Sequence, residues 1–124
     1  SVYGSGHVGF FGGTIQATNV PEILQIDCVA TDFYKKREAY PTYLFYNPYQ
    51  EEKTVSFNAG LKSVDLYDTV SRRFLQRGVR GNIKFSIPAD AARVLVVIPE
   101  GTRISVENKV LMAGKTPIDF GYGR

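Results

Sequence analysis

Lys53-Thr54-Val55-Ser56-Phe57-Asn58 alternates apolar and polar residues along its whole length. Successive side chains of a β-strand point to opposite faces of a sheet, so Val55 and Phe57 share one face and the small polar residues share the other. A strand of this kind packs on a core with one face and meets solvent with the other. The stretch therefore predicts a layered β-structure.

The same two-residue period continues on both sides of this stretch. Further strands are expected at Thr42–Tyr46, Val64–Leu66, Phe74–Val79, Ile83–Ile87 and Val94–Ile98, in a hairpin of Ile104–Val106 with Val110–Met112, and in a last edge strand at Pro117–Phe120. Val94–Ile98 has no polar face, which indicates a central strand, after a connector at Ala89–Ala92. Turn residues recur at intervals of about 8–12 residues, as in antiparallel sandwiches. The predicted fold class is all-β, an antiparallel β-sandwich of jelly-roll type.

Residues 1–39 differ in composition from residues 40–124. Five glycines fall within the first 13 residues, which also contain Tyr3, Phe10 and Phe11. Glycine loses much conformational entropy in regular structure, so residues 1–39 are expected to form an irregular lead-in or linker that packs on the β-sandwich of residues 40–124. The length of 124 residues fits one domain overall.

The segment Pro21–Ala30 fits two kinds of secondary structure. The residues ahead of Pro21 resemble a helix start, because proline is favoured at the first helical position. The apolar residues that follow fit a helical stripe as well as an alternating strand. The β-branched content favours the strand, and the helix stays an alternative.

Charge and hydropathy exclude several classes of partner. The 15 basic and 12 acidic residues give a net charge of +3, and the basic residues cluster only at Lys35-Lys36-Arg37 and Arg72-Arg73. A nucleic-acid-binding face is denser than this, so no nucleic-acid partner is expected. No apolar run approaches the roughly 20 residues that span a bilayer, and no signal peptide is visible. No membrane partner is expected, and the compartment stays open.

The sequence offers few residues for catalysis. Asp27 and Asp32 are candidate paired carboxylates, but residues five apart on a strand point to opposite faces. His7 and Cys28 are the single histidine and cysteine, and a lone cysteine in an apolar run is more often a small buried hydrophobe than a nucleophile. One cysteine and one histidine do not make a zinc site. No catalytic residue, metal or cofactor is therefore expected in this chain.

Two further motifs match functional patterns only by letter. Gly4-Ser5-Gly6-His7-Val8-Gly9 has the glycines of a dinucleotide-binding loop, but too few residues precede it for the required strand. Asp65-Leu66-Tyr67-Asp68 has two acids, and a calcium site needs more oxygen ligands than these. The expected role of Asp68 is to initiate a turn.

Aromatic residues supply the candidate ligand site. The chain has eight Tyr, eight Phe and no Trp, and many of them crowd between residues 40 and 49. Tyrosine rings stack on the apolar faces of sugars, and amides bind hydroxyl groups, so the candidate ligand-binding residues are Tyr43, Tyr46, Asn47 and Tyr49. The same residue types fill sandwich cores, and packing is the favoured interpretation.

Four stretches together carry a family resemblance. They are Tyr40–Tyr49, Lys53–Val55, Val64–Asp68 and Ile87–Val94. They resemble the C-terminal β-sandwich of large bacterial glycosidase-like proteins, where the sandwich follows an (α/α)₆ toroid. Gly9–Gly13 and Thr18–Val20 resemble the end of that toroid or the linker after it.

This resemblance implies a function for the chain. It implies a non-catalytic accessory domain that packs against and stabilises the catalytic domain of a parent polypeptide, with the catalytic acids upstream. A chain that begins at Ser1 and has Met112 as its sole methionine favours a piece of a longer protein. The alternative is a carbohydrate-binding module that uses exposed tyrosines, with a glycan as its partner.

Overall fold

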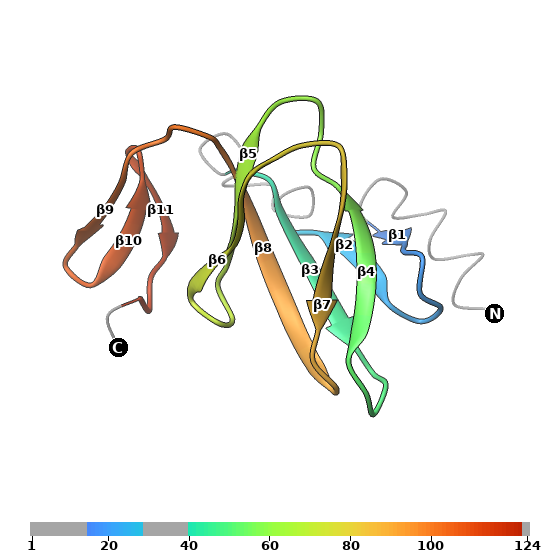
Figure 1. Cartoon of the computed structure of the whole chain (residues 1–124). Helices are drawn as coiled ribbons and strands as arrows, with labels where there is room; N and C mark the ends of the chain where they lie inside the picture. The colour runs from blue at the N-terminus through green and yellow to red at the C-terminus, as the bar shows by residue number, and fades with distance from the viewer. Residues whose placement is uncertain (1–14, 29–39, 123–124) are drawn as a thin grey trace.

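The computed structural model describes residues 15–28 and 40–122, which form β-strands and turns (Figure 1). The strands of this part of the chain are β1 (Ile15–Ala17), β2 (Leu24–Asp27), β3 (Thr42–Asn47), β4 (Lys53–Asn58), β5 (Val64–Asp68), β6 (Arg73–Val79), β7 (Asn82–Ile87), β8 (Ala91–Pro99), β9 (Ile104–Glu107), β10 (Val110–Ala113) and β11 (Thr116–Asp119). Every pairing among them is antiparallel. The prediction of an all-β antiparallel sandwich is confirmed.

Some sequence expectations fall outside the described residues. They concern His7, the Gly4–Gly9 motif, Asp32, the Lys35–Arg37 cluster and most of the glycine-rich lead-in. Among the described residues, no helix is long and apolar enough to cross a membrane.

The strands form three sheets. The largest has the order β1-β2-β3-β8-β5-β6, the second pairs β4 with β7, and the third has the order β11-β10-β9. In Figure 1, β4 and β7 cross in front of β3 and β8, and β9–β11 stand beside β5 and β6. The expected central strand is confirmed, since β8 lies between β3 and β5. It begins at Ala91, because Ala91 and Ala92 pair with Asn47 and Tyr46, so these alanines are not the expected connector.

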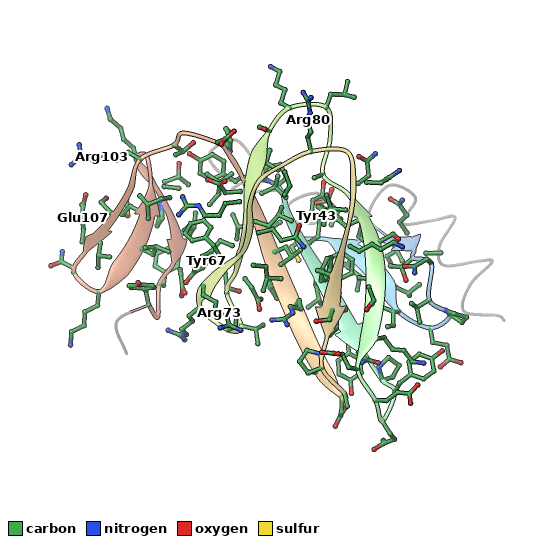
Figure 2. All side chains as sticks on the ribbon, in the orientation of Figure 1. Tyr43, Tyr67, Arg73, Arg80, Arg103 and Glu107 are labelled. Carbon is green, nitrogen blue, oxygen red and sulfur yellow. The ribbon has the colours of Figure 1, made fainter. Side chains whose placement is uncertain are left out.

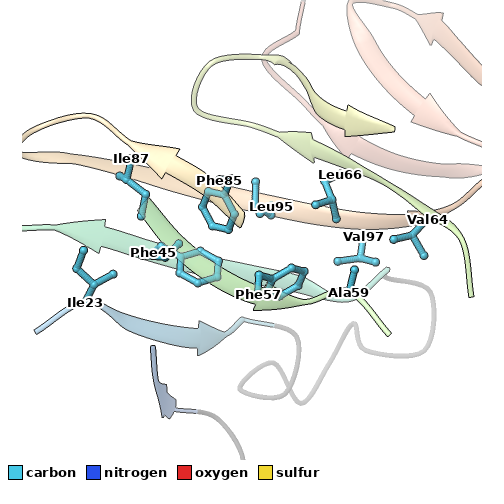
Figure 3. Close-up of a cluster of buried hydrophobic side chains, with 11 residues drawn as sticks. Ile23, Phe45, Phe57, Ala59, Val64, Leu66, Phe85, Ile87, Leu95 and Val97 are labelled. Carbon is cyan, nitrogen blue, oxygen red and sulfur yellow. The ribbon is translucent and has the colours of Figure 1, made fainter. Parts of the chain in front are cut away.

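The main core lies between the six-stranded sheet and the β4–β7 pair (Figure 3). Its buried members are Ile23, Phe45, Val55, Phe57, Ala59, Val64, Leu66, Phe85, Ile87, Leu95 and Val97. Phe45 meets Phe85 edge-to-face with ring centroids 5.0 Å apart, and it meets Phe57 at 5.9 Å. Such aromatic pairs contribute about 0.5–1.5 kcal/mol each beyond their buried area. The predicted inward positions Val55 and Phe57 are confirmed.

A second core forms on the opposite face of the six-stranded sheet. Its buried members are Tyr67, Val96, Ile98, Leu111 and Ala113. Leu111 and Ala113 belong to β10, so the β9–β11 sheet covers the part of the face where Tyr67, Val96 and Ile98 lie. Tyr67 lies between the two sheets (Figure 2) and donates its hydroxyl to Asp119 at 2.8 Å. Strand β5 is therefore buried on both faces rather than only at Val64 and Leu66.

The free edges of the β4–β7 pair are covered by side chains. Asn19 binds β4 as a strand would: its Nδ2 donates to the Thr54 carbonyl at 3.3 Å, and its Oδ1 accepts from the Ser56 amide at 2.7 Å. On β7, Gln76 and Arg93 donate to two backbone carbonyls at 2.7 and 2.9 Å. These bonds join the two layers and occupy groups that an exposed edge offers to other chains.

The residues around Pro21 form a turn, so the helix alternative is wrong. The Ile23 amide donates to the Val20 carbonyl at 3.2 Å, and Glu22 has a φ of 71°. A left-handed residue at this point cannot begin a right-handed helix. The preferred strand is confirmed over Leu24–Asp27.

Candidate functional site

The four predicted ligand residues do not form one surface. They lie along β3 and in the turn that follows it, where successive side chains point to opposite faces. Tyr43 faces the main core, where its ring meets Phe57 edge-on with centroids 5.3 Å apart. Burial, and secondarily the charge of Asp27, raises the pKa of the Tyr43 hydroxyl. Tyr43 therefore packs chiefly against the core.

Asn47 is fully buried and holds two turns together. Its Nδ2 donates to the carbonyls of Glu51, Ile87 and Pro88 at 2.9–3.0 Å. Its Oδ1 accepts from the Tyr49 amide at 2.9 Å. Every polar atom of this side chain is bound to the backbone, so its amide joins the β3–β4 turn to the β7–β8 turn.

Tyr49 is also held by protein partners. Its hydroxyl donates to the Pro21 carbonyl at 2.7 Å, and the ammonium of Lys53 lies 4.5 Å from the centre of its ring. The hydroxyl joins the β3–β4 turn to the β1–β2 turn, and the cation covers part of the ring.

Of the four residues, Tyr46 has the most accessible ring. Its side chain points to the face opposite Tyr43 and is 47% exposed. Its hydroxyl donates to Oδ1 of Asp90, and this hydrogen bond is the main cause of a raised pKa for Tyr46. Asp90 has a φ of 49°, and its amide donates to the Tyr49 carbonyl at 3.0 Å. Tyr46 and Asp90 thus form a fixed pair at the end of the sandwich.

Asp68 supports the fold. Its carboxylate accepts from Arg93 at 2.9 Å and from the backbone amides of Val94, Val70 and Ser71 at 3.0–3.2 Å. Burial opposes ionisation, but the hydrogen bonds from Arg93 and these neighbours outweigh it and lower the pKa of Asp68. The amides of Val70 and Ser71 show the expected turn-initiating role, and Arg93 adds an ion pair that the sequence did not indicate.

Asp65 has nitrogen donors as partners as well. It accepts from Arg77 at 3.3 Å and from the Gly78 amide at 2.8 Å. In residues 15–28 and 40–122, no group of three His, Cys, Asp or Glu side chains could hold a metal ion. Cys28 lies beside Asp27, and burial followed by that charge raises the pKa of its thiol, which makes it a poorer nucleophile.

The outer face of the six-stranded sheet carries an apolar row that sequence reasoning missed. The register aligns Ile15, Ile26, Leu44 and Val94, one residue from each of β1, β2, β3 and β8. We call these four residues the outer apolar row. Each is half-buried, and none belongs to either core cluster.

The other exposed sheet face shows the contrast. The outward positions of β4 and β7 are polar or charged, as at Thr54, Ser56, Lys84 and Ser86. Those residues suit a face that meets water, whereas four aligned aliphatic residues suit a face that meets another surface. The sequence contains each residue of the row, but only the register brings them together.

No protein-family model and no curated protein matches the chain. A solved structure from Bacillus halodurans C-125, described as a "putative alpha-N-acetylgalactosaminidase", is similar with a TM-score of 0.48 and 14% identity. The similarity covers 70% of this chain and 21% of that chain, so this chain spans about a fifth of its length. It is a weak similarity to a glycosidase chain and concerns the course of the backbone.

Proposed function

We propose that this chain is a non-catalytic accessory β-sandwich of a carbohydrate-active enzyme, and that its outer apolar row packs against the catalytic domain of the parent polypeptide. The row carries the packing part of the proposal. Four aliphatic side chains aligned across four strands have the composition of an interface core, and polar positions lie on the other sheet face. The link to carbohydrate rests on the sequence resemblance of Tyr40–Tyr49, Val64–Asp68 and Ile87–Val94.

The ionisable groups support a scaffolding role. Asp65 and Asp68 each form an ion pair with an arginine, and Asp119 accepts a hydrogen bond from the Tyr67 hydroxyl. A hydrolytic pair instead presents two carboxyl groups to a substrate about 5–9.5 Å apart. We propose that the catalytic acids of the enzyme lie in the preceding domain.

Co-purification tests this proposal. The chain and the preceding part of its gene product would be expressed in the same cells as two separate polypeptides. One of the two would carry an affinity tag. We expect the two to purify together, and we expect Leu44→Lys or Val94→Lys to abolish the association. Thr54→Lys is the matched control, since it adds the same charge to the polar sheet face. The proposal would be refuted if the unaltered chain did not associate with the preceding part, or if the association survived both Leu44→Lys and Val94→Lys.

A further inference from the structure

We infer that Tyr46 and Asp90 form a binding site for a sugar ring without an acidic group, either a neutral sugar or an amino sugar. This inference rests on the proposed function for the choice of carbohydrate as ligand. The site lies at the end of the sandwich, where the β3–β4 turn meets the β7–β8 turn. Tyr46 lies on the same sheet face as the outer apolar row, two residues from Leu44, so sugar binding is tested on the isolated chain and docking is tested separately.

The Tyr46 ring can act as a stacking platform. Its side chain is 47% exposed, and the hydrogen bond from its hydroxyl to Asp90 restrains the ring. The apolar C–H face of a pyranose packs on such a ring, in the same way that planar ligands stack on aromatic side chains. A platform restrained before binding loses little conformational entropy when the ligand arrives.

Asp90 supplies the polar half of the site. It uses Oδ1 for the Tyr46 hydroxyl, and its Oδ2 makes no hydrogen bond with any described residue. That oxygen is available to accept from a sugar hydroxyl or ammonium group. The left-handed backbone of Asp90, tolerated by aspartate, is held by the bond from its amide to the Tyr49 carbonyl at 3.0 Å.

The base of the site is rigid because three turns are bonded to one another. Asn47 joins the β3–β4 turn to the β7–β8 turn through its bonds to the Ile87 and Pro88 carbonyls. Tyr49 joins the β3–β4 turn to the β1–β2 turn through the Pro21 carbonyl. Two of the residues first predicted to bind ligand therefore position the pair that would contact it.

Charge selects the class of sugar. The converging turns carry Glu22, Glu51 and Glu52 in addition to Asp90, and the adjacent cation Lys53 is paired with Glu51 at 2.8 Å. Sugars that carry carboxylate or sulfate groups would be repelled by this end of the molecule. Neutral sugars avoid that repulsion, and a protonated amino group gains attraction.

The test is a titration of the isolated chain, followed by amide NMR shifts, with three matched ligands: methyl glucoside, glucosamine and glucuronate, and then their galactose counterparts. We expect saturable shifts at residues 46 and 89–92 with neutral or amino sugars, and at least tenfold weaker binding of the acidic sugar. Tyr46→Ala should weaken binding about tenfold or more, with aromatic stacking as the guide. Asp90→Ala should do the same.

Matched variants separate a binding role from a structural one. Tyr46→Phe keeps the ring and removes its bond to Asp90, so we expect a smaller loss than for Tyr46→Ala. Tyr122→Ala removes another exposed tyrosine and should leave binding unchanged. The dispersion of the amide spectrum reports folding of each variant.

Three results would overturn the inference. They are no binding of any of these sugars by the folded chain, unchanged binding by folded Tyr46→Ala and Asp90→Ala, or acidic sugars bound as tightly as neutral ones. Co-purification with the preceding domain is read separately, so failure of the sugar site leaves the docking proposal standing. Loss of docking with sugar binding retained refutes only the docking proposal.

Discussion

The guanidinium of Arg93 bonds to both layers of the sandwich. Its Nη1 donates to the fully buried carboxylate of Asp68 at 2.9 Å, and its Nε donates to the Ser86 carbonyl of β7 at 2.9 Å. A buried charge that keeps its partner is tolerated, but one that loses its partner destabilises the fold. The Asp68–Arg93 pair therefore links the largest sheet to the β4–β7 pair.

Removal of Asp68 should destabilise the protein strongly. Asp68→Ala leaves Arg93 with little solvent exposure and no carboxylate, and it removes an acceptor from three backbone amides. We expect the free energy of unfolding to fall by about 3–5 kcal/mol, measured by urea denaturation. Glu52→Ala, at an exposed position, is the control and should change it by less than about 0.5 kcal/mol. Equal effects of the two substitutions would contradict this account.

Stability should fall in acid, and Asp68 should account for part of the fall. Its pKa in the folded protein lies below the ordinary value of 3.8, so its contribution is present above that value. The contribution is lost as the pH drops below 3.8 and through the lower, folded-state pKa. Urea denaturation between pH 7 and pH 2 measures this slope. Asp68→Asn should flatten it, and an unchanged slope would assign the acid sensitivity to other groups.

The outer apolar row should make the isolated chain self-associate. Aligned aliphatic residues on a half-exposed sheet face favour contact with a second apolar surface when no partner domain is present. Sedimentation velocity over a range of concentrations should show reversible association. Val94→Lys should shift the equilibrium towards the monomer, whereas Thr54→Lys should not. A monodisperse unaltered chain at every concentration would contradict the expectation.

Loss of the Asn47 amide should loosen the end of the sandwich. Asn47→Ala leaves the Ile87 and Glu51 carbonyls without their donor, and we expect about 1–3 kcal/mol of destabilisation in urea. Because the same amide joins the turns beneath Tyr46 and Asp90, amide exchange at residues 49–52 and 89–90 should accelerate. Protection that is unchanged at both turns would show that other contacts hold them.

Much of the fold was predictable because it depends on local periodicity. The alternation of Lys53–Asn58, the wholly apolar run of Val94–Ile98 and the turn residues between segments each specify a strand or its end through nearest neighbours. The turn at Pro21 was the ambiguous point. There Glu22 has a left-handed backbone conformation that no sequence pattern indicates, and this conformation excludes the start of a helix.

The candidate site was less predictable for a specific reason. Tyr43, Tyr46, Asn47 and Tyr49 are neighbours in sequence, but alternation along β3 sends the first two to opposite faces, and the last two bind backbone groups of distant turns. The partner of Tyr46 is Asp90, which lies 44 residues further along the chain. No local pattern links these two residues.

The sequence by itself determined the strands from Thr42 onward and that the chain builds a layered β-domain, because these properties follow from the order of neighbouring residues. Strand β1, the choice of strand over helix after Pro21 and the burial of both faces of β5 came from the tertiary structure. Tertiary structure alone decided that Ile15, Ile26, Leu44 and Val94 align in one row, that Arg93 reaches Asp68, and that Asp90 holds Tyr46. Strand order and register set which distant residues become neighbours, and they arise from the packing of the whole chain.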